Sequence, residues 1–319
     1  MAITAALVKE LREMTGAGMM DCKKALTEVD GDMEKAVEWL RENGMAKAQK
    51  KAGRIAAEGI VMLKVSEDGK KAVAVEVNSE TDFVAKNADF RGFVNEIADQ
   101  ILTTDAEDVE AFLAEPWSKE PEKTVSQYVD YWIAVIGEKL SVRRFAKCEV
   151  ENGFIAAYNH MDGKIGVLVE VETDVVNDAV KEMGENIAMQ AAAMRPSYCT
   201  SSEIPGDFIE KEREILKATI MNDPVESQKP EKVIEGMIKG RINKELKEIV
   251  LLDQVYVKAE DGKQTVSGYV KEVAKENGAA VSVKSFVRFE TGEGLEKRSE
   301  NFAEEVAAQA AKVAANAAK

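Results

Sequence analysis

One pattern occurs twice along this chain and limits the folds available to it. In the first copy, a strand pattern beginning at Glu58 passes through an Asp-Gly turn at 68–69 and continues as an alternating Val-Glu-Val strand to Val77. In the second copy, the same order turns at 162–163 and ends its strand at Val171. An amphipathic helix follows each copy. The repetition predicts an internal duplication: two α+β subdomains, each an antiparallel sheet backed by helices.

The turn after each repeated strand differs between the copies. A Glu-Thr-Asp sequence occurs at 80–82 and again at 172–174, but the next residue is Phe83 in the first copy and Val175 in the second. Phe83 is in phase with the apolar stripe of the following helix, and this periodicity favours a core position. Alternatively, Asn87 could cap a helix that starts after it, leaving Phe83 on a short protruding connection. The sister copy indicates that the fold itself does not demand an aromatic ring there.

The first 54 residues are expected to form a separate helical unit. Apolar residues at helical spacing predict three short helices between residues 4 and 43. Breaks are predicted around Gly16 and at the Asp-Gly of 30–31, and the Asn-Gly of 43–44 predicts the end of the third helix. Residues 45–54 are rich in Ala and Lys and predict a solvated, partly helical linker. A phosphate-binding strip is the alternative, and the acidity of the chain disfavours it.

The C-terminal half adds further helices. Two amphipathic stripes separated by Pro224 and Pro230 predict an antiparallel helical hairpin. Strands near 253–258 and 280–289 are expected to complete the second subdomain. An Ala-rich helix over 299–318 is expected to dock at the end of the chain or to contact a partner. The resulting domains are 1–54 (three helices and linker), 55–140 (first core subdomain), 141–205 with 253–286 (second core subdomain), 206–252 (hairpin) and 287–319 (C-terminal module).

Bulk properties exclude several classes of function. The 319 residues carry a formal net charge of −15, which argues against broad nucleic-acid or membrane-surface binding. No apolar run reaches the length of a membrane span, and the N-terminus lacks a targeting pattern, so we expect a cytoplasmic protein. Cys22, Cys148 and Cys199 are widely spaced and are expected to be reduced thiols.

Catalytic chemistry is not predicted. His160 is the single histidine, which disfavours His-based metal sites and Ser-His or Cys-His catalytic pairs; it is expected on a hairpin turn. The chain contains no phosphate loop, dinucleotide fingerprint, HExxH motif or EF-hand loop. Carboxylates are abundant, but abundance alone does not indicate a site, because an acid–base pair needs two carboxyls held in different environments. We therefore expect no enzyme activity, no metal site and no cofactor.

Two long segments resemble signatures of bacterial elongation factor Ts. They span 11–26, which reads Leu-Arg-Glu-Met-Thr-Gly-Ala-Gly-Met-Met-Asp-Cys-Lys-Lys-Ala-Leu, and 76–86, which contains Thr-Asp-Phe-Val. Shorter matches extend the resemblance over essentially the whole chain, at 136–138, 143–144, Tyr158-x-His160, 165–168 and 288–294. The resemblance implies a ubiquitin-associated-like three-helix domain, a duplicated α+β core, a coiled-coil hairpin and a C-terminal helical module.

The same resemblance implies guanine-nucleotide exchange on the GTPase elongation factor Tu. It implies that Thr81, Asp82, Phe83 and Val84 insert into the GTPase domain and dislodge its magnesium ion, so that GDP leaves. The GDP and Mg²⁺ belong to the partner, and no cofactor of the chain's own is implied. Other implied partner contacts are Arg12, Met19, Met20, Lys23, Tyr158, His160 and Val257.

The family usually has His where this chain has Gln190, so a contact made by that imidazole is in doubt. The alternatives for assembly are a homodimer and a 2:2 complex with the partner. Residues 103–130 are longer than in compact members of the family and have no assigned role. The alternative functions are a scaffold or adaptor that acts through residues 1–54 and a hydrolase built on carboxylates.

Overall fold

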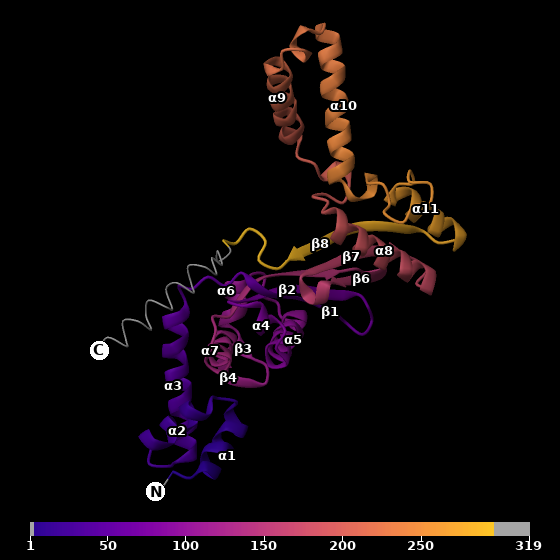
Figure 1. The fold of residues 1–319 in the computed structure, drawn as a ribbon. Helices are drawn as coiled ribbons and strands as arrows, with labels where there is room; N and C mark the ends of the chain where they lie inside the picture. The colour runs from indigo at the N-terminus through magenta and orange to yellow at the C-terminus, as the bar shows by residue number, and fades with distance from the viewer. Residues whose placement is uncertain (1–2, 297–319) are drawn as a thin grey trace.

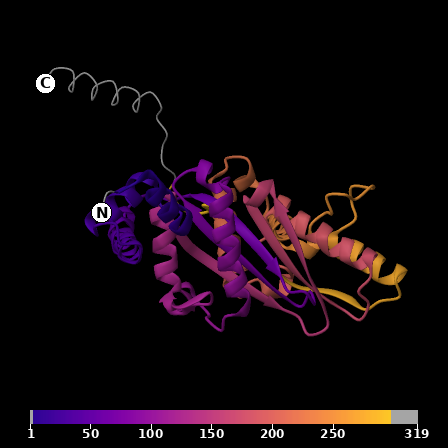
Figure 2. The same ribbon diagram turned by 90° about the horizontal axis from the view of Figure 1, so that it is seen from below.

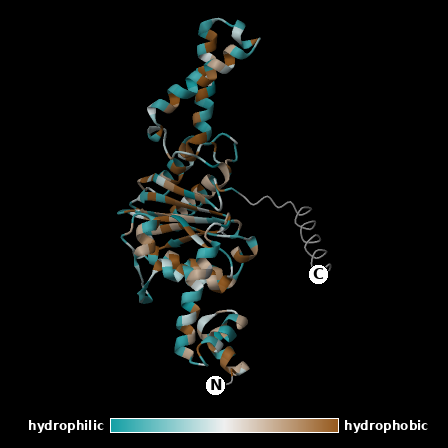
Figure 3. Cartoon of the chain, turned by 90° about the vertical axis from the view of Figure 1, so that its left-hand side faces the viewer, coloured by the Kyte–Doolittle hydropathy of each residue, from teal (hydrophilic) through white to brown (hydrophobic). Residues whose placement is uncertain are grey.

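The computed structural model describes residues 3–296 of the chain. An N-terminal helical domain lies at one end, a core of sheets and helices in the middle, and a helical hairpin at the other end (Figure 1). Hydropathy coloured on the chain shows hydrophobic residues in the core and also on the helices of both extensions (Figure 3). The mixture of helices with antiparallel sheets confirms the predicted α+β class. No described helix has the length and apolar character needed to cross a membrane.

Three helices form the N-terminal domain: α1 (Ala5–Thr15), α2 (Met19–Glu28) and α3 (Met33–Lys51). Asp32 caps α3 as predicted, by accepting a hydrogen bond from the Lys35 backbone N–H. The predicted end of this helix at 43–44 is wrong, because α3 continues through Gly44. A Cβ added at Gly44 would lie 3.2 Å from the Cβ of Ala134, so the glycine serves close helix packing instead of a C-cap.

Two three-stranded antiparallel sheets form the core. The first has the order β1-β2-β5, with β1 (Glu58–Val65), β2 (Lys71–Ser79) and β5 (Ser141–Glu149). The second has the order β6-β7-β8, with β6 (Gly153–His160), β7 (Ile165–Thr173) and β8 (Val281–Glu290). The strand expected near 280–289 is thus confirmed. The strand expected near 253–258 is wrong: η4 (Leu251–Asp253) leads into an irregular loop held by buried Gln254.

The two sheets pack face to face, with helices on their outer sides (Figure 2). Side chains alternate along a strand, so Val73, Val75 and Val77 of β2 pack on α5 (Ala88–Thr103). The corresponding valines of β7 pack on α8 (Asp178–Met194). The facing sides meet through small residues. A Cβ added at Gly166 would lie 2.5 Å from Cγ1 of Val61, so the sheets approach too closely there for a side chain.

Backbone details confirm the duplication. Gly59 and Gly153 occupy the same place at the start of each hairpin, with φ of 126° and 129°. A Cβ on either would collide with a carbonyl oxygen of the paired strand, at 2.1 and 2.0 Å. The pairing of the central strand with the third strand is irregular at the same point in both copies, after Glu76 and after Glu170.

The duplication extends further than the sequence analysis recognised. A Thr-Val-Ser-x-Tyr-Val sequence at 124–129 and 265–270 begins α7 (Val125–Ile136) and α11 (Val266–Glu276). Its threonine caps the helix in both copies. Each helix then leads into the third strand of its sheet. Helix α11 was not predicted, although the repeated six-residue sequence was the signal that could have found it.

Each copy carries its insertion at the same topological position. Between α5 and α7 lie α6 (Val109–Ala114), β3 (Pro116–Trp117) and β4 (Glu120–Thr124). Between α8 and α11 lie η2 (Ser201–Glu203) and the hairpin of α9 (Gly206–Asn222) and α10 (Glu231–Ile249), joined through η3 (Glu226–Gln228). The hairpin was predicted. Most of the extra residues of 103–130 form the corresponding insertion of the first copy. Trp117 anchors this insertion by stacking on Tyr128 of α7, with ring centroids 4.1 Å apart.

Strand pairing bears on the proposed domain limits. β5 pairs with β2, so residues 141–149 complete the first sheet and not the second subdomain. β8 runs without a break across the limit proposed between residues 286 and 287, because it is hydrogen-bonded to β7 along its length. The helix expected over 299–318 lies outside the described residues.

Candidate partner-binding site

A single helical turn, α4 (Asp82–Ala85), carries Phe83 between β2 and α5. Thr81 caps this turn by accepting a hydrogen bond from the Val84 backbone N–H at 3.4 Å. Val84 packs inward against the core, and Phe83 points outward with 82% of its surface exposed. The core position that periodicity favoured is therefore wrong. Asn87 ends the turn and caps α5, as the alternative required, by accepting from the backbone N–H groups of residues 89 and 90.

Asp82 places a carboxylate beside the exposed ring. Its Oδ2 pairs with Lys86 Nζ at 2.7 Å within the same turn. The hydrogen bond from Lys86 lowers the pKa of the Asp82 carboxyl, so the group stays ionised at neutral pH. Its position in the first turn of α4 also favours a negative charge. Within the Thr-Asp-Phe-Val motif, Thr81 and Val84 therefore stabilise the turn, while Asp82 and Phe83 face outward.

The sister turn lacks this helical turn altogether. Strand pairing aligns Gly59–Asn78 with Gly153–Glu172, so Ser79 corresponds to Thr173. Both hydroxyls donate to the carbonyl two residues ahead, at 3.0 and 3.1 Å. The matching of the two Glu-Thr-Asp sequences, and of Phe83 with Val175, is therefore wrong. The first copy has four additional residues between its strand and its helix cap, and these form α4.

A hollow of about 660 Å³ lies beside Phe83 and joins the two copies. Its rim includes Met161, 69% exposed, in η1 (Met161–Gly163) of the second copy. Arg91 of α5 bridges the two sides of this hollow. Its Nε donates to the Ala85 carbonyl at 3.0 Å, and its Nη atoms donate to the Asp162 carboxylate at 2.9 and 2.7 Å. The Phe83 turn is therefore held in a defined place relative to the second copy.

Tyr158 and His160 lie at the end of β6, directly before Met161 on the rim of this hollow. His160 is the last residue of β6 and not part of the turn, which is the η1 segment that follows. The Tyr158 hydroxyl is 3.0 Å from His160 Nδ1, and the two rings stack with centroids 5.8 Å apart. His160 is exposed, and Tyr158 is half-buried. The pair presents an aromatic, polar edge to solvent.

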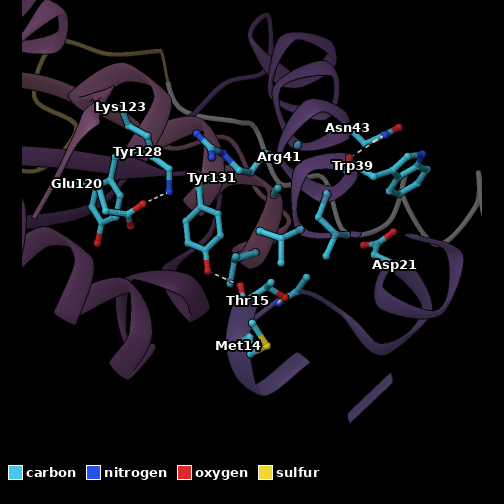
Figure 4. Close-up of a pocket in the computed structure, with 16 residues that line it drawn as sticks. Met14, Thr15, Asp21, Trp39, Arg41, Asn43, Glu120, Lys123, Tyr128 and Tyr131 are labelled. Carbon is cyan, nitrogen blue, oxygen red and sulfur yellow. Dashed lines mark hydrogen bonds and ion pairs between the residues drawn. The ribbon is translucent and has the colours of Figure 1, made fainter. Parts of the chain in front are cut away.

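The candidate contacts of the N-terminal domain are exposed on α1 and α2. Arg12, Met19, Met20 and Lys23 all face solvent. The domain is fixed to the core at the end of α1, where the Tyr131 hydroxyl of α7 donates to the Thr15 carbonyl (Figure 4). A hollow of about 280 Å³ remains in this junction, lined from both sides. The orientation of the exposed residues is therefore set by α7.

Comparison with known proteins shows the family of the chain. A family model described as Elongation factor TS matches residues 80–293. Elongation factor Ts of Clostridium novyi (strain NT) is 51% identical over 307 residues, which cover 96% of this chain and 98% of the relative. The protein of that name from Clostridioides difficile (strain 630) is 52% identical, with the same shares covered, 96% and 98%. The chain belongs to the elongation factor Ts family. The resemblance drawn from the sequence is confirmed, and the role is that of an elongation factor in translation.

The departure from the elongation factor Ts pattern at Gln190 has a structural explanation. Gln190 is fully buried in α8. Its Nε2 donates to Gln254 Oε1 and to the Val255 carbonyl, both at 3.1 Å, and its Oε1 accepts from the Val257 N–H at 2.8 Å. A partner cannot reach this side chain directly. Gln190 instead shapes the loop that exposes Val257, the remaining candidate contact.

The described residues contain no group of three or more His, Cys, Asp or Glu side chains arranged to hold a metal ion. All three cysteines are free and buried. Burial raises the pKa of the Cys148 and Cys199 thiols to about 12, with nearby Glu170 adding to the effect in both cases. These thiols are therefore protonated at neutral pH, as expected for structural cysteines.

Proposed function

We propose that this elongation factor Ts family member is a guanine-nucleotide exchange factor for elongation factor Tu, acting in the cytoplasm without catalytic residues or a cofactor of its own. The observation that carries the proposal is the exposure of Phe83 on α4. The turn is capped and anchored, yet it holds a large apolar ring in water. Burial of that ring against a partner would stabilise the complex by about 1.5–3 kcal/mol relative to leaving the ring in water.

The chemistry of exchange follows from what such a turn can do at a nucleotide site. Magnesium bridges the phosphate oxygens of a bound nucleotide to ligands from the GTPase. An apolar wedge such as Phe83 would displace the segment that supports the metal, and the Asp82 carboxylate would disturb its polar surroundings. Loss of the metal leaves the diphosphate charges less compensated, so GDP dissociates. GTP can then bind to the emptied site.

The magnitude requires more than the wedge. A ten-thousandfold weakening of nucleotide binding needs roughly 5.5 kcal/mol of differential binding. Burial of one Phe supplies about 1.5–3 kcal/mol. The other candidate contacts must contribute the rest by favouring the nucleotide-free partner. The exposed residues of α1 and α2, the Tyr158–His160 edge and the Val257 loop extend from the N-terminal domain to the second copy of the core and support a broad interface. The coupling is reciprocal, so bound nucleotide must weaken the complex equally.

The proposal is tested by release of fluorescent GDP from elongation factor Tu in a stopped-flow instrument. The intact protein should accelerate release, and Phe83→Ala should reduce that acceleration by about 10- to 150-fold, as expected from loss of one buried ring. Val176→Ala is the matched control, because it shortens an exposed apolar residue in the sister turn. Absence of acceleration by the intact protein, or equal rates for the two variants, would contradict the proposal.

A further inference from the structure

The segment that follows β2, at 80–81, and the segment that precedes β5, at 138–139, are joined by reciprocal hydrogen bonds. In each direction, a glutamate carboxylate of one segment accepts from backbone N–H groups of the other. Glu80 Oε1 accepts from the Lys139 backbone N–H at 2.6 Å. In return, Glu138 Oε2 accepts from the backbone N–H groups of Glu80 and Thr81, at 3.1 and 3.0 Å. Glu138 Oε1 accepts from the Thr81 hydroxyl at 2.7 Å. One side chain thus satisfies three donors of the segment that leads into α4.

The second copy contains only one of these two sets of hydrogen bonds, the one that corresponds to the contact made by Glu80. Asn78 pairs with Ser141 in the first copy, and Glu172 pairs with Ser282 at the same point of the second copy. Glu80 lies two residues after Asn78, and Asp174 lies two residues after Glu172, so Asp174 is the counterpart of Glu80. Asp174 Oδ1 accepts from the Ala280 N–H at 2.8 Å, which reproduces the contact of Glu80 with Lys139.

The residue corresponding to Glu138 in the second copy is Ala279, which has no acceptor in its side chain. The half that both copies share belongs to the fold. The half made by Glu138 occurs only in the copy that carries α4 and Phe83.

The position of Glu138 explains how it acts on the turn. The β2–β5 ladder ends at Asn78 and Ser141, so the next N–H groups have no strand partner. Glu138 supplies the acceptors and extends the order of the sheet as far as Thr81. Because the Thr81 hydroxyl donates to Glu138, its lone pair is directed toward the Val84 N–H, which it caps. The direction of α4, and hence of Phe83, therefore depends on this carboxylate.

We propose that Glu138 is a positioning residue that holds the Phe83 turn in the orientation required for nucleotide exchange, an inference that rests on the proposed function. Glu138 acts through Thr81, and Phe83 makes the contact with the GTPase. The carboxylate preorganises the turn, so that the partner does not have to order it on binding. Removal of the carboxylate lowers the fraction of molecules whose turn is ready to bind.

The first measurement is independent of the partner. Amide hydrogen exchange in peptides covering residues 78–86 should be at least about tenfold faster in Glu138→Ala, because two protected N–H groups lose a charged acceptor. Glu138→Gln should stay within about threefold of wild type, since an amide oxygen can accept both N–H bonds and its NH₂ can donate to Thr81 Oγ1. Asp174→Ala is the matched control and should accelerate exchange only around its own turn. Unchanged exchange at 78–86 in Glu138→Ala would overturn the proposal.

The second measurement uses GDP release from elongation factor Tu. Glu138→Ala should reduce the acceleration about tenfold, Glu138→Gln should restore most of it, and Asp174→Ala should match wild type. In the double variant with Phe83→Ala, loss of Glu138 should have little further effect, because its target is already absent. Multiplying effects, or a normal rate in Glu138→Ala, would overturn the positioning role. If the intact protein fails to accelerate release, the proposed function fails, and amide exchange still decides whether Glu138 holds the turn.

Discussion

Replacement of Glu76 by Gln should destabilise the whole core. Glu76 is 0% exposed and lies on the face of β2 opposite the helices. Its carboxylate accepts from the Gly292 N–H at 2.7 Å, from Arg144 Nε at 2.6 Å and from Arg143 Nη1 at 3.0 Å. Asn78 Nδ2 adds a further bond at 3.0 Å. These donors come from β2, β5 and the turn after β8, so one carboxylate connects both sheets.

The expected loss can be worked out from these contacts. Removing one member of a buried ion pair costs about 3–5 kcal/mol, because the opposite charge is left uncompensated. Arg143 and Arg144 are 23% and 30% exposed, and they also donate to the carbonyls of Glu293, just after β8, and of Glu290, the last residue of β8. Water and these remaining partners relieve part of the penalty, which places the loss near the lower end, about 3 kcal/mol. The glutamine NH₂ would also face guanidinium donors.

Equilibrium unfolding in urea, followed by circular dichroism, measures this loss. Glu151→Gln removes the same charge from an exposed position and should change the free energy of unfolding by no more than about 0.5 kcal/mol. Comparable m-values in the two variants would show that the same cooperative unit unfolds. A loss below about 1 kcal/mol for Glu76→Gln would refute the view that this carboxylate joins the sheets.

The contribution of Glu76 to the free energy of unfolding should depend on pH. Burial alone would raise the pKa of Glu76, but the hydrogen bonds from Gly292, Asn78, Arg144 and Arg143 outweigh burial and hold that pKa below its ordinary value. A depressed folded-state pKa stabilises the protein above the unfolded pKa, about 4.3 for Glu, and that stability is lost as the pH falls through the folded value. The difference in unfolding free energy between wild type and Glu76→Gln should therefore shrink below about pH 4.

Three further predictions concern packing and reactivity. Gly166→Ala should cost about 1–3 kcal/mol in urea unfolding, because its Cβ would lie 2.5 Å from a valine methyl of the facing sheet; Gly92→Ala, in open space on α5, should be neutral or stabilising. Tyr131→Phe should lose about 1 kcal/mol of the attachment between α1 and α7, seen as faster amide exchange at the end of α1 with no change in α5. Cys148, whose pKa burial raises to about 12, should resist iodoacetamide at pH 8 until urea unfolds the chain; rapid labelling of the native protein would contradict its burial.

Local signals in the sequence predicted many of the elements. Asp32 and Asn87 cap helices because their side chains accept from nearby backbone N–H groups, and this chemistry needs only a few neighbouring residues. Gly69 turns the first hairpin with a φ of 72°, a conformation that glycine adopts freely. Alternating valines placed β2 and β7 correctly. Such features depend on short stretches of chain and can be read from them.

Features that depend on distant partners could not be read in the same way. Gly44 resembles a helix end, but its environment is set by Ala134 on another helix. The loop around Gln254 looks like a strand in sequence, yet Gln190 of α8 holds its backbone by donating to the Val255 carbonyl and accepting from the Val257 N–H. The exposure of Phe83 depended on whether the helix ended before Asn87, and the periodicity of the apolar residues did not contain that information.

The two copies together separate what the fold needs from what function adds. The positive-φ glycine, the irregular strand pairing, the Thr-capped helix and the Glu80 or Asp174 contact occur in both copies, which indicates that they serve the fold. Helix α4, its exposed Phe83 and the Glu138 carboxylate occur in one copy only. The second copy forms the same sheet and helix without them, so the repeated sheet and helix do not depend on them. Under the proposed exchange function, residues that are both unmatched between the repeats and exposed, as Phe83 is, are the ones to test first for partner contacts.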